Sequence, residues 1–114
     1  MSADKKNPAA LPHSQAQALA ELILPTAGGV VSRTLVDRPQ GTITLFFFDE
    51  SQGLSEHSAP FDAFVQVVEG ELELTIGGQP VKVTQGQVCL MPAQVPHAVR
   101  AQVPSKMLLV MIRG

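Results

Sequence analysis

Apolar and polar residues alternate along much of the chain after residue 30. The clearest run spans residues 71–76, Glu-Leu-Glu-Leu-Thr-Ile, in which every second side chain is a large apolar one. Because successive side chains of a β-strand point to opposite faces, this alternation predicts a strand with one face in a core and the other in water. The Gly77-Gly78 pair that follows is typical of a two-residue hairpin turn, so we expect the chain to fold back on itself there.

Further apolar or alternating stretches predict strands, and turn residues separate them. One of these stretches contains three consecutive phenylalanines, Phe46, Phe47 and Phe48, which cannot share one face of a strand. Both faces of that strand must therefore be covered. Seven to nine short strands of this kind indicate an all-β sandwich or barrel. The expected strands are residues 30–36, 42–49, 54–58, 63–68, 71–76, 81–84, 87–91, 97–102 and 106–112.

The beginning of the chain has a different pattern. Residues 1–13 are mostly polar and contain prolines, so we expect a flexible N-terminal arm there. Ser14, followed three positions later by Gln17, has the form of a helix capping box. The apolar positions from residue 16 to residue 23 then follow helical spacing until Pro25 ends it. We therefore expect a short helix, packed on the outside of the barrel or on a partner subunit.

Composition restricts the class of protein. The chain has 114 residues, 45% of them hydrophobic, and a formal net charge of -2. We therefore expect one domain, residues 14–114, with one core and no nucleic-acid partner. Nothing approaches the ~20 apolar residues of a membrane span, and no apolar segment follows the N-terminal lysines as in a secretory signal. We expect a cytoplasmic protein without membrane contact, in which the single cysteine, Cys89, is an inert thiol within an apolar run.

Two segments, residues 53–70 and 86–101, contain the candidate chemistry. Each begins with a glycine and contains one histidine. The two segments resemble the paired motifs of the cupins, small β-barrels whose interior usually holds a metal. The resemblance covers residues 43–112 and implies an all-β, jelly-roll-type cupin barrel, here with a short N-terminal helix. The matching residues are His57 and Gly70 in the first segment, and Gly86, Pro92 and His97 in the second. Gly53, at the start of the first segment, lies slightly closer to His57 than in the cupin motif.

The segments depart from the cupin motifs at other positions. The second histidine of the first motif is replaced by Ala59, and its glutamate by Ala63. In the second motif Gln94 stands for a glycine and Ala101 for an asparagine. Two of the four usual metal ligands are therefore missing.

The two remaining histidines, His57 and His97, are expected to face the barrel interior and to meet there. Two imidazoles are fewer than the three or four ligands that zinc or non-haem iron typically has. Asp62 is a candidate substitute ligand, although the alternation of strand faces points it away from the interior. We therefore expect either no cofactor or a weakly bound divalent metal at His57, His97 and Asp62.

The other side chains expected around the two histidines are apolar, which is the character of many small-molecule sites. Such a site would use the histidines as its polar anchors. The candidate lining residues are Leu45, Phe47, Val65, Val67, Val99, Met107, Leu109 and Met111.

Three functions are open from the sequence. The first is a small-molecule-binding domain whose apolar pocket is anchored by two histidines, with little or no metal dependence. The second, implied by the resemblance, is a metal-dependent enzyme of dioxygenase or isomerase type that uses His57, His97 and a substitute ligand. The third is a structural or regulatory homodimer whose cavity is filled by Phe and Met side chains. Open barrels with unpaired strand edges have physical reason to pair, so we expect a homodimer with residues 30–49 as the interface.

Overall fold

The computed structural model of this chain describes residues 9–113, and these residues form nine strands and one short 3-10 turn. Every expected strand is present, and its limits differ from the expected ones by no more than two residues. None of the helical structure in this range has the length or hydropathy of a membrane span. The strands are β1 (Val30–Arg38), β2 (Gly41–Phe48), β3 (Gly53–His57), β4 (Asp62–Glu69), β5 (Glu71–Ile76), β6 (Gln79–Thr84), β7 (Val88–Met91), β8 (His97–Ala101) and β9 (Ser105–Ile112).

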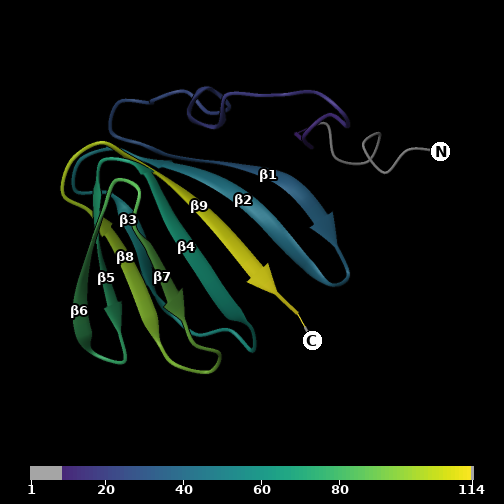
Figure 1. Cartoon of the computed structure of the whole chain (residues 1–114). Coiled ribbons are helices and arrows are strands. Elements are labelled where there is room, and N and C mark those ends of the chain that lie inside the picture. The colour runs from purple at the N-terminus through teal and green to yellow at the C-terminus, as the bar shows by residue number, and fades with distance from the viewer. Residues whose placement is uncertain (1–8, 114) are drawn as a thin grey trace.

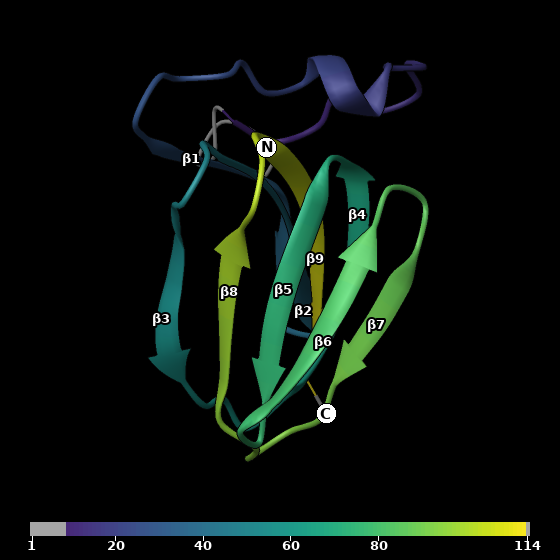
Figure 2. The same ribbon diagram turned by 90° about the vertical axis from the view of Figure 1, so that its left-hand side faces the viewer.

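The strands form two facing sheets, both antiparallel. The larger sheet has the order β1-β2-β9-β4-β7 and dominates the view in Figure 1. The smaller has the order β3-β8-β5-β6 and lies in front of the larger one in Figure 2. Strands far apart in sequence are neighbours, for example β2 beside β9 and β3 beside β8. This is a jelly-roll sandwich, and the expected all-β fold is confirmed.

The inner core lies between the two sheets. Leu72 and Leu74 of β5 are fully buried, whereas Glu73 between them is exposed, as the alternation predicted. These leucines belong to the same cluster as Val65 and Val67 of β4 in the opposite sheet. Each sheet therefore contributes one apolar face to a single interior.

A second apolar group, the outer cluster, covers part of the other face of the five-stranded sheet. It includes Leu45 and Phe47 of β2 and Ile23 of the N-terminal segment, all of them buried. Phe46 and Phe48 point the other way and pack with the inner core, their rings stacked with centroids 5.5 Å apart. Both faces of this strand are thus covered, as expected. The N-terminal segment supplies the outer cover, running beside β1 in Figure 1.

The prediction of a short N-terminal helix is wrong. Only a 3-10 turn, Leu19–Glu21, forms, and its N-cap residue makes no side-chain capping bond. Ser14 has a left-handed φ of 61°, whereas a helix N-cap needs an extended backbone. The stretch between Pro12 and Pro25, residues 13–24, is only at the lower limit of the ~12–15 residues that an isolated helix needs for stability. Of the expected flexible arm, residues 1–8 lie outside the described residues.

Side chains of the barrel hold the N-terminal segment in place. The Arg33 guanidinium on β1 donates hydrogen bonds to the carbonyl oxygens of Ala9 (2.8 Å) and Leu22 (3.0 Å). The buried Lys106 ammonium on β9 donates to the carbonyl oxygen of Ala20. A helix would use such carbonyls in its own hydrogen bonds. Contacts with the barrel therefore favour the irregular path that the segment takes.

Candidate functional site

His57 and His97 lie side by side at one end of the four-stranded sheet. His57 is the last residue of β3, His97 is the first residue of β8, and the two are partners across this strand pair. Their imidazole rings meet edge to face, with centroids 4.4 Å apart and an interplanar angle of 72°. The structure thus brings together the two histidines of the motif segments, and we call them the histidine pair.

Each imidazole is held by the backbone carbonyl two residues before it. Nδ1 of His57 lies 2.9 Å from the carbonyl oxygen of Ser55, and Nδ1 of His97 lies 3.2 Å from that of Val95. A carbonyl oxygen only accepts hydrogen bonds, so each Nδ1 carries the hydrogen and donates it. In a neutral imidazole of this tautomer the lone pair lies on Nε2. Both rings are therefore oriented through one nitrogen, with the other left as an acceptor.

The two members of the histidine pair differ in exposure. His97 is only 3% exposed, whereas His57 is open to solvent. Burial and, to a lesser extent, the charge of the neighbouring His57 lower the pKa of His97, against a smaller opposing effect of its bond to Val95. His97 is thus the inner, neutral member of the pair at neutral pH, and His57 is the outer member.

The histidine pair opens into a small pocket between the sheets, the histidine pocket, with a volume of about 20 Å³. That is room for about one water molecule, far below the ~300–1,000 Å³ of sites for drug-sized ligands. Three methionines occupy the wall opposite the histidines. The lining residues are Leu54, His57, Ala63, Met91, His97, Val99, Met107, Leu109 and Met111.

The expected lining residues on β4, β8 and β9 face the interior, but not all of them reach the histidine pocket. Val65 and Val67 are fully buried in the inner core and lie outside the pocket wall. Met91 does line the pocket, although it is not among the lining residues expected from the sequence. Its signal was its position in the run from Val88 to Met91, where it shares the inward face with Cys89. The expected residues that line the pocket are Val99, Met107, Leu109 and Met111.

The assignment of Phe47 and Leu45 to the pocket is wrong. Both lie in the outer cluster, on the opposite face of the five-stranded sheet. Strand alternation separates Phe47 from Phe46 and Phe48 but does not say which set points inward. The pairing of β2 with β9 decides this, because it places Phe46 opposite Met107, whose side chain lies in the inner core.

The side chains at the histidine pair do not fit a divalent metal held by three or four His, Cys, Asp or Glu ligands. Across residues 9–113, no group of three or more such side chains comes together. Ala59 and Ala63 have no donor atom in their side chains. Asp62, the expected substitute, is exposed, and its Oδ1 accepts a hydrogen bond from the backbone N–H of Ala93 at 2.9 Å. The structure therefore does not bring Asp62 into one group with the histidine pair, and its carboxylate supports a loop.

Two backbone features fix the position of the histidine pair. Gln94, at a glycine position of the cupin motif, has a left-handed φ of 69°, and its N–H donates to the carbonyl of Ala59 at 2.8 Å. This bond joins the loop before His97 to the loop after His57. At the other end of β3, a Cβ on Gly53 would lie 1.9 Å from the carbonyl oxygen of Val99. Close pairing of β3 with β8 thus requires glycine at position 53.

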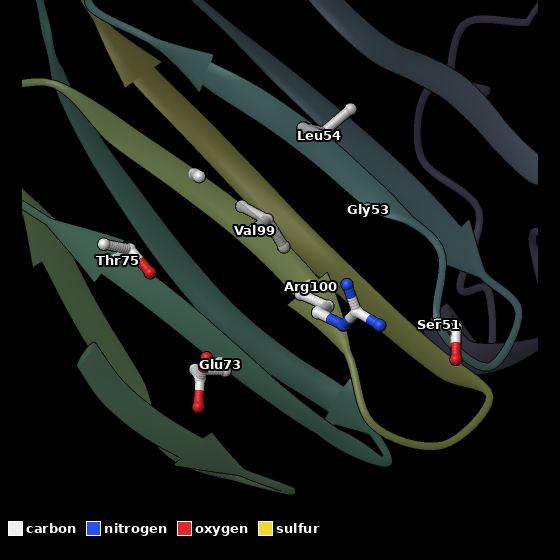
Figure 3. Close-up of a pocket in the computed structure, with 8 residues that line it drawn as sticks. Ser51, Gly53, Leu54, Glu73, Thr75, Val99 and Arg100 are labelled. Carbon is white, nitrogen blue, oxygen red and sulfur yellow. The ribbon is translucent and has the colours of Figure 1, made fainter.

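A larger hollow of about 310 Å³ lies over the outward face of the four-stranded sheet, at strands β3, β8 and β5 (Figure 3). Its charged side chains, Glu73 and Arg100, come from neighbouring strands and are exposed. Leu54 and Val99 line both this hollow and the histidine pocket, so the wall between the two is thin. The hollow contains no histidine, and exposed strand faces commonly have charges of both signs. We therefore place the candidate site at the histidine pair.

Cys89 on β7 is half-buried and lies outside the histidine pocket. Burial raises the pKa of its thiol, which reduces the fraction of reactive thiolate at neutral pH. This agrees with the expectation of an inert thiol.

Comparisons with known proteins place the chain in a family. The model of the cupin domain family matches residues 45–113. A conserved protein of unknown function from Streptococcus pyogenes is 36% identical, with a TM-score of 0.87 and 91% of each chain covered. A cupin superfamily protein from Desulfitobacterium hafniense is 27% identical, with a TM-score of 0.85 and 91% of this chain and 95% of the other covered. A search of curated proteins found no match. The chain therefore belongs to the cupin family.

Proposed function

We propose that this cupin is a binding domain whose site is the histidine pair, and that it works without a standard divalent metal centre. The observation that supports the proposal is that His57 and His97 are held in the same way, each through its Nδ1. Each ring is fixed through Nδ1 to a backbone carbonyl, which leaves Nε2 of each ring as an acceptor, and both rings line one apolar pocket. Apolar pockets with a few convergent polar groups are typical of ligand sites.

The lining of the histidine pocket favours binding over catalysis. Among the described residues, none of those that line it is acidic, so the pair has no carboxylate partner for acid–base chemistry. Imidazoles whose Nδ1 carries the hydrogen can accept a hydrogen bond from a bound donor group at Nε2. The exposure of His57 gives a ligand access from solvent.

The volume of the histidine pocket limits what it binds. At about 20 Å³, the pocket admits an occupant of about one heavy atom. A larger ligand would need the methionine side chains to move, which their unbranched, flexible chains allow. We therefore propose that the ligand is either a single ion or a molecule with a slender group that fits between the histidines and the methionines.

The test is a double-mutant cycle on the histidine pair. Protein labelled at the imidazoles is titrated with small ligands, and binding is measured for wild type, His57→Ala, His97→Ala and the double variant. Groups in one site couple, so we expect the two single losses not to add. His13→Ala is the matched control and should bind as wild type does. Additive losses, or binding that persists in the double variant, would contradict a common site.

We further propose that the protein forms a homodimer through the outward face of the five-stranded sheet. Strand pairing places five apolar residues in one row across all five strands of this sheet, and their neighbour Ile112 is 58% exposed. Such a row is longer than the scattered apolar residues of an ordinary surface. It shares Val36 and Ile43 with the interface expected from the sequence. The row consists of Val36, Ile43, Val110, Phe64 and Leu90.

Sedimentation equilibrium tests the dimer. Leu90 is 55% exposed, so Leu90→Asp should leave the fold intact and weaken self-association. Val103→Asp, at a 44% exposed loop position outside the row, is the matched control. A monomeric wild type, or a Leu90→Asp variant that associates as wild type does, would contradict this interface.

A further inference from the structure

We infer that the histidine pocket binds a soft monovalent metal ion, Cu(I) or its chemical analogue Ag(I), through the imidazoles of His57 and His97 and the thioethers of the methionines opposite them. The inference rests on the proposed function, because it names the occupant of that same site. It depends on three features: how the imidazoles are presented, what faces them, and how little charge surrounds them.

The imidazoles are presented as metal ligands usually are. Ligating histidines typically donate the hydrogen of the non-ligating nitrogen to a carboxylate, a carbonyl or water, which fixes the tautomer. His57 and His97 both do this through Nδ1, to the carbonyls of Ser55 and Val95. Both imidazoles are thus held in the tautomer in which Nε2 can bind a metal.

The wall opposite the histidines contains sulfur. Ala63 of β4 pairs with Met91 of β7 on one side and with Met111 of β9 on the other. All three residues line the histidine pocket, and Met107 lines it further along β9. Ala63, which lies between the two flanking methionines, has a small side chain without a donor atom. Thioether sulfur is a soft ligand that prefers Cu(I) to the common divalent metals.

The histidine pocket has little charge to balance a cation. Among the described residues, its lining consists of two histidines and apolar side chains. Placing an ion in such surroundings is costly, and the cost rises steeply with its charge. A monovalent ion is therefore favoured over a divalent one by charge as well as by ligand softness. The volume of about 20 Å³ suits a single ion.

Methionine is also a common filler of irregular cores, and this alternative makes a different prediction. Leucine has nearly the same volume as methionine but no sulfur, so a Met→Leu exchange in a core is usually well tolerated. If the methionines only fill space, their exchange for leucine will leave metal binding unchanged. If they are ligands, binding will weaken while the fold persists.

The experiment titrates the full chain with Ag(I), which is not oxidised as Cu(I) is, by calorimetry. The background is Cys89→Ala, because the free thiol at Cys89 is itself a soft ligand outside the pocket. We expect one Ag(I) per chain and binding at least about tenfold tighter than that of Zn(II). We expect Met91→Leu and Met111→Leu each to weaken Ag(I) binding about tenfold or more, within the range seen when metal sites lose supporting groups.

The variants also separate this inference from the proposed function. His13→Ala should bind Ag(I) as the background protein does, and His97→Ala should abolish the binding. Absence of Ag(I) binding, binding unaffected by both Met→Leu exchanges, or tighter binding of Zn(II) would each overturn the inference. If Ag(I) does not bind but a small ligand still shifts the NMR signals of both His57 and His97, the proposed function stands and the inference about a metal ion does not. If nothing perturbs the histidine pair, both fail.

Discussion

The two apolar groups on opposite faces of the five-stranded sheet both contain buried side chains of β2, but they differ in what borders them. Strand β2 supplies both, with Phe47 in the outer cluster and Phe48 in the inner core. The N-terminal segment closes the outer cluster with apolar side chains such as Ile23. The inner core instead continues to His57 and His97, whose nitrogens are oriented by backbone carbonyls. Burial alone therefore does not mark a site; the oriented polar atoms at one end of the inner core do.

The largest expected effect separates stability from binding. Phe47→Ala should lower the free energy of unfolding by about 3–5 kcal/mol, since the buried ring leaves a cavity in the outer cluster. Urea denaturation measures the loss. The NMR signals of His57 and His97 should stay in place, because Phe47 lies on the other face of the sheet. Leu24→Ala, at a 75% exposed position of the N-terminal segment, should change stability by less than about 0.5 kcal/mol. Displaced histidine signals in Phe47→Ala would mean that the two faces are not independent.

A smaller loss of stability is expected when the hydrogen bonds that hold the N-terminal segment on the outer cluster are removed. Arg33→Met removes two charge-assisted hydrogen bonds to the N-terminal segment and should cost on the order of 2 kcal/mol. Limited proteolysis should then cut residues 9–25 faster. Arg38→Met is the control, because the exposed Arg38 side chain bonds only the carbonyl of its own neighbour, Asp37, among the described contacts of its guanidinium. Equal behaviour of the two variants would show that Arg33 does not secure the cover.

The next effect concerns the strand that holds His57. Gly53→Ala forces a Cβ against the carbonyl oxygen of Val99, and should cost on the order of 1–2 kcal/mol through overpacking. Because β3 must move away from β8, the chemical shifts of His57 should change as well. Ser55→Ala, at an exposed position of the same strand, should do neither. A Gly53→Ala variant with an unshifted His57 would contradict the role given to this glycine.

The smallest effect is a dependence of stability on pH. The pKa of His97 is lowered by burial, so the unfolded chain binds the proton more readily than the folded one. Stability should therefore fall as the pH drops below about 6.5, the ordinary pKa of histidine, until the pH passes below the folded pKa. His97→Gln should flatten this part of the curve, whereas His13→Gln should not. Thermal unfolding across this range checks the prediction, and identical curves for His97→Gln and wild type would contradict it.

The sequence predicted the strands well because their signal is local. The alternation in residues 71–76 and the Gly77-Gly78 turn are decided by neighbours in the chain, and both appear in the structure as a hairpin. The prediction of an N-terminal helix was wrong because the conformation of this segment depends on Arg33 and Lys106. Both are distant in sequence and donate hydrogen bonds to its carbonyls. Helix propensity, which depends on neighbouring residues, contains no information about such distant hydrogen-bond partners.

The candidate site was half predictable for the same reason. His57 and His97 were found from the motif segments, and strand parity rightly placed Asp62 away from the interior. Parity could not say whether Phe47 or Phe48 faces inward, since that depends on the pairing of β2 with β9. Met91 was missed because the sequence does not reveal that Ala63 lies between it and Met111.

The most direct test of the account is a long-range ¹H–¹⁵N correlation spectrum of the imidazoles in the Cys89→Ala protein, recorded with and without Ag(I). We predict that His57 and His97, where neutral, both carry the hydrogen on Nδ1. One equivalent of Ag(I) should shift both Nε2 resonances together, with His13 as the internal reference. A hydrogen on Nε2 of either ring, or a shift of one ring without the other, would contradict the claim that the inner core ends in a single binding site.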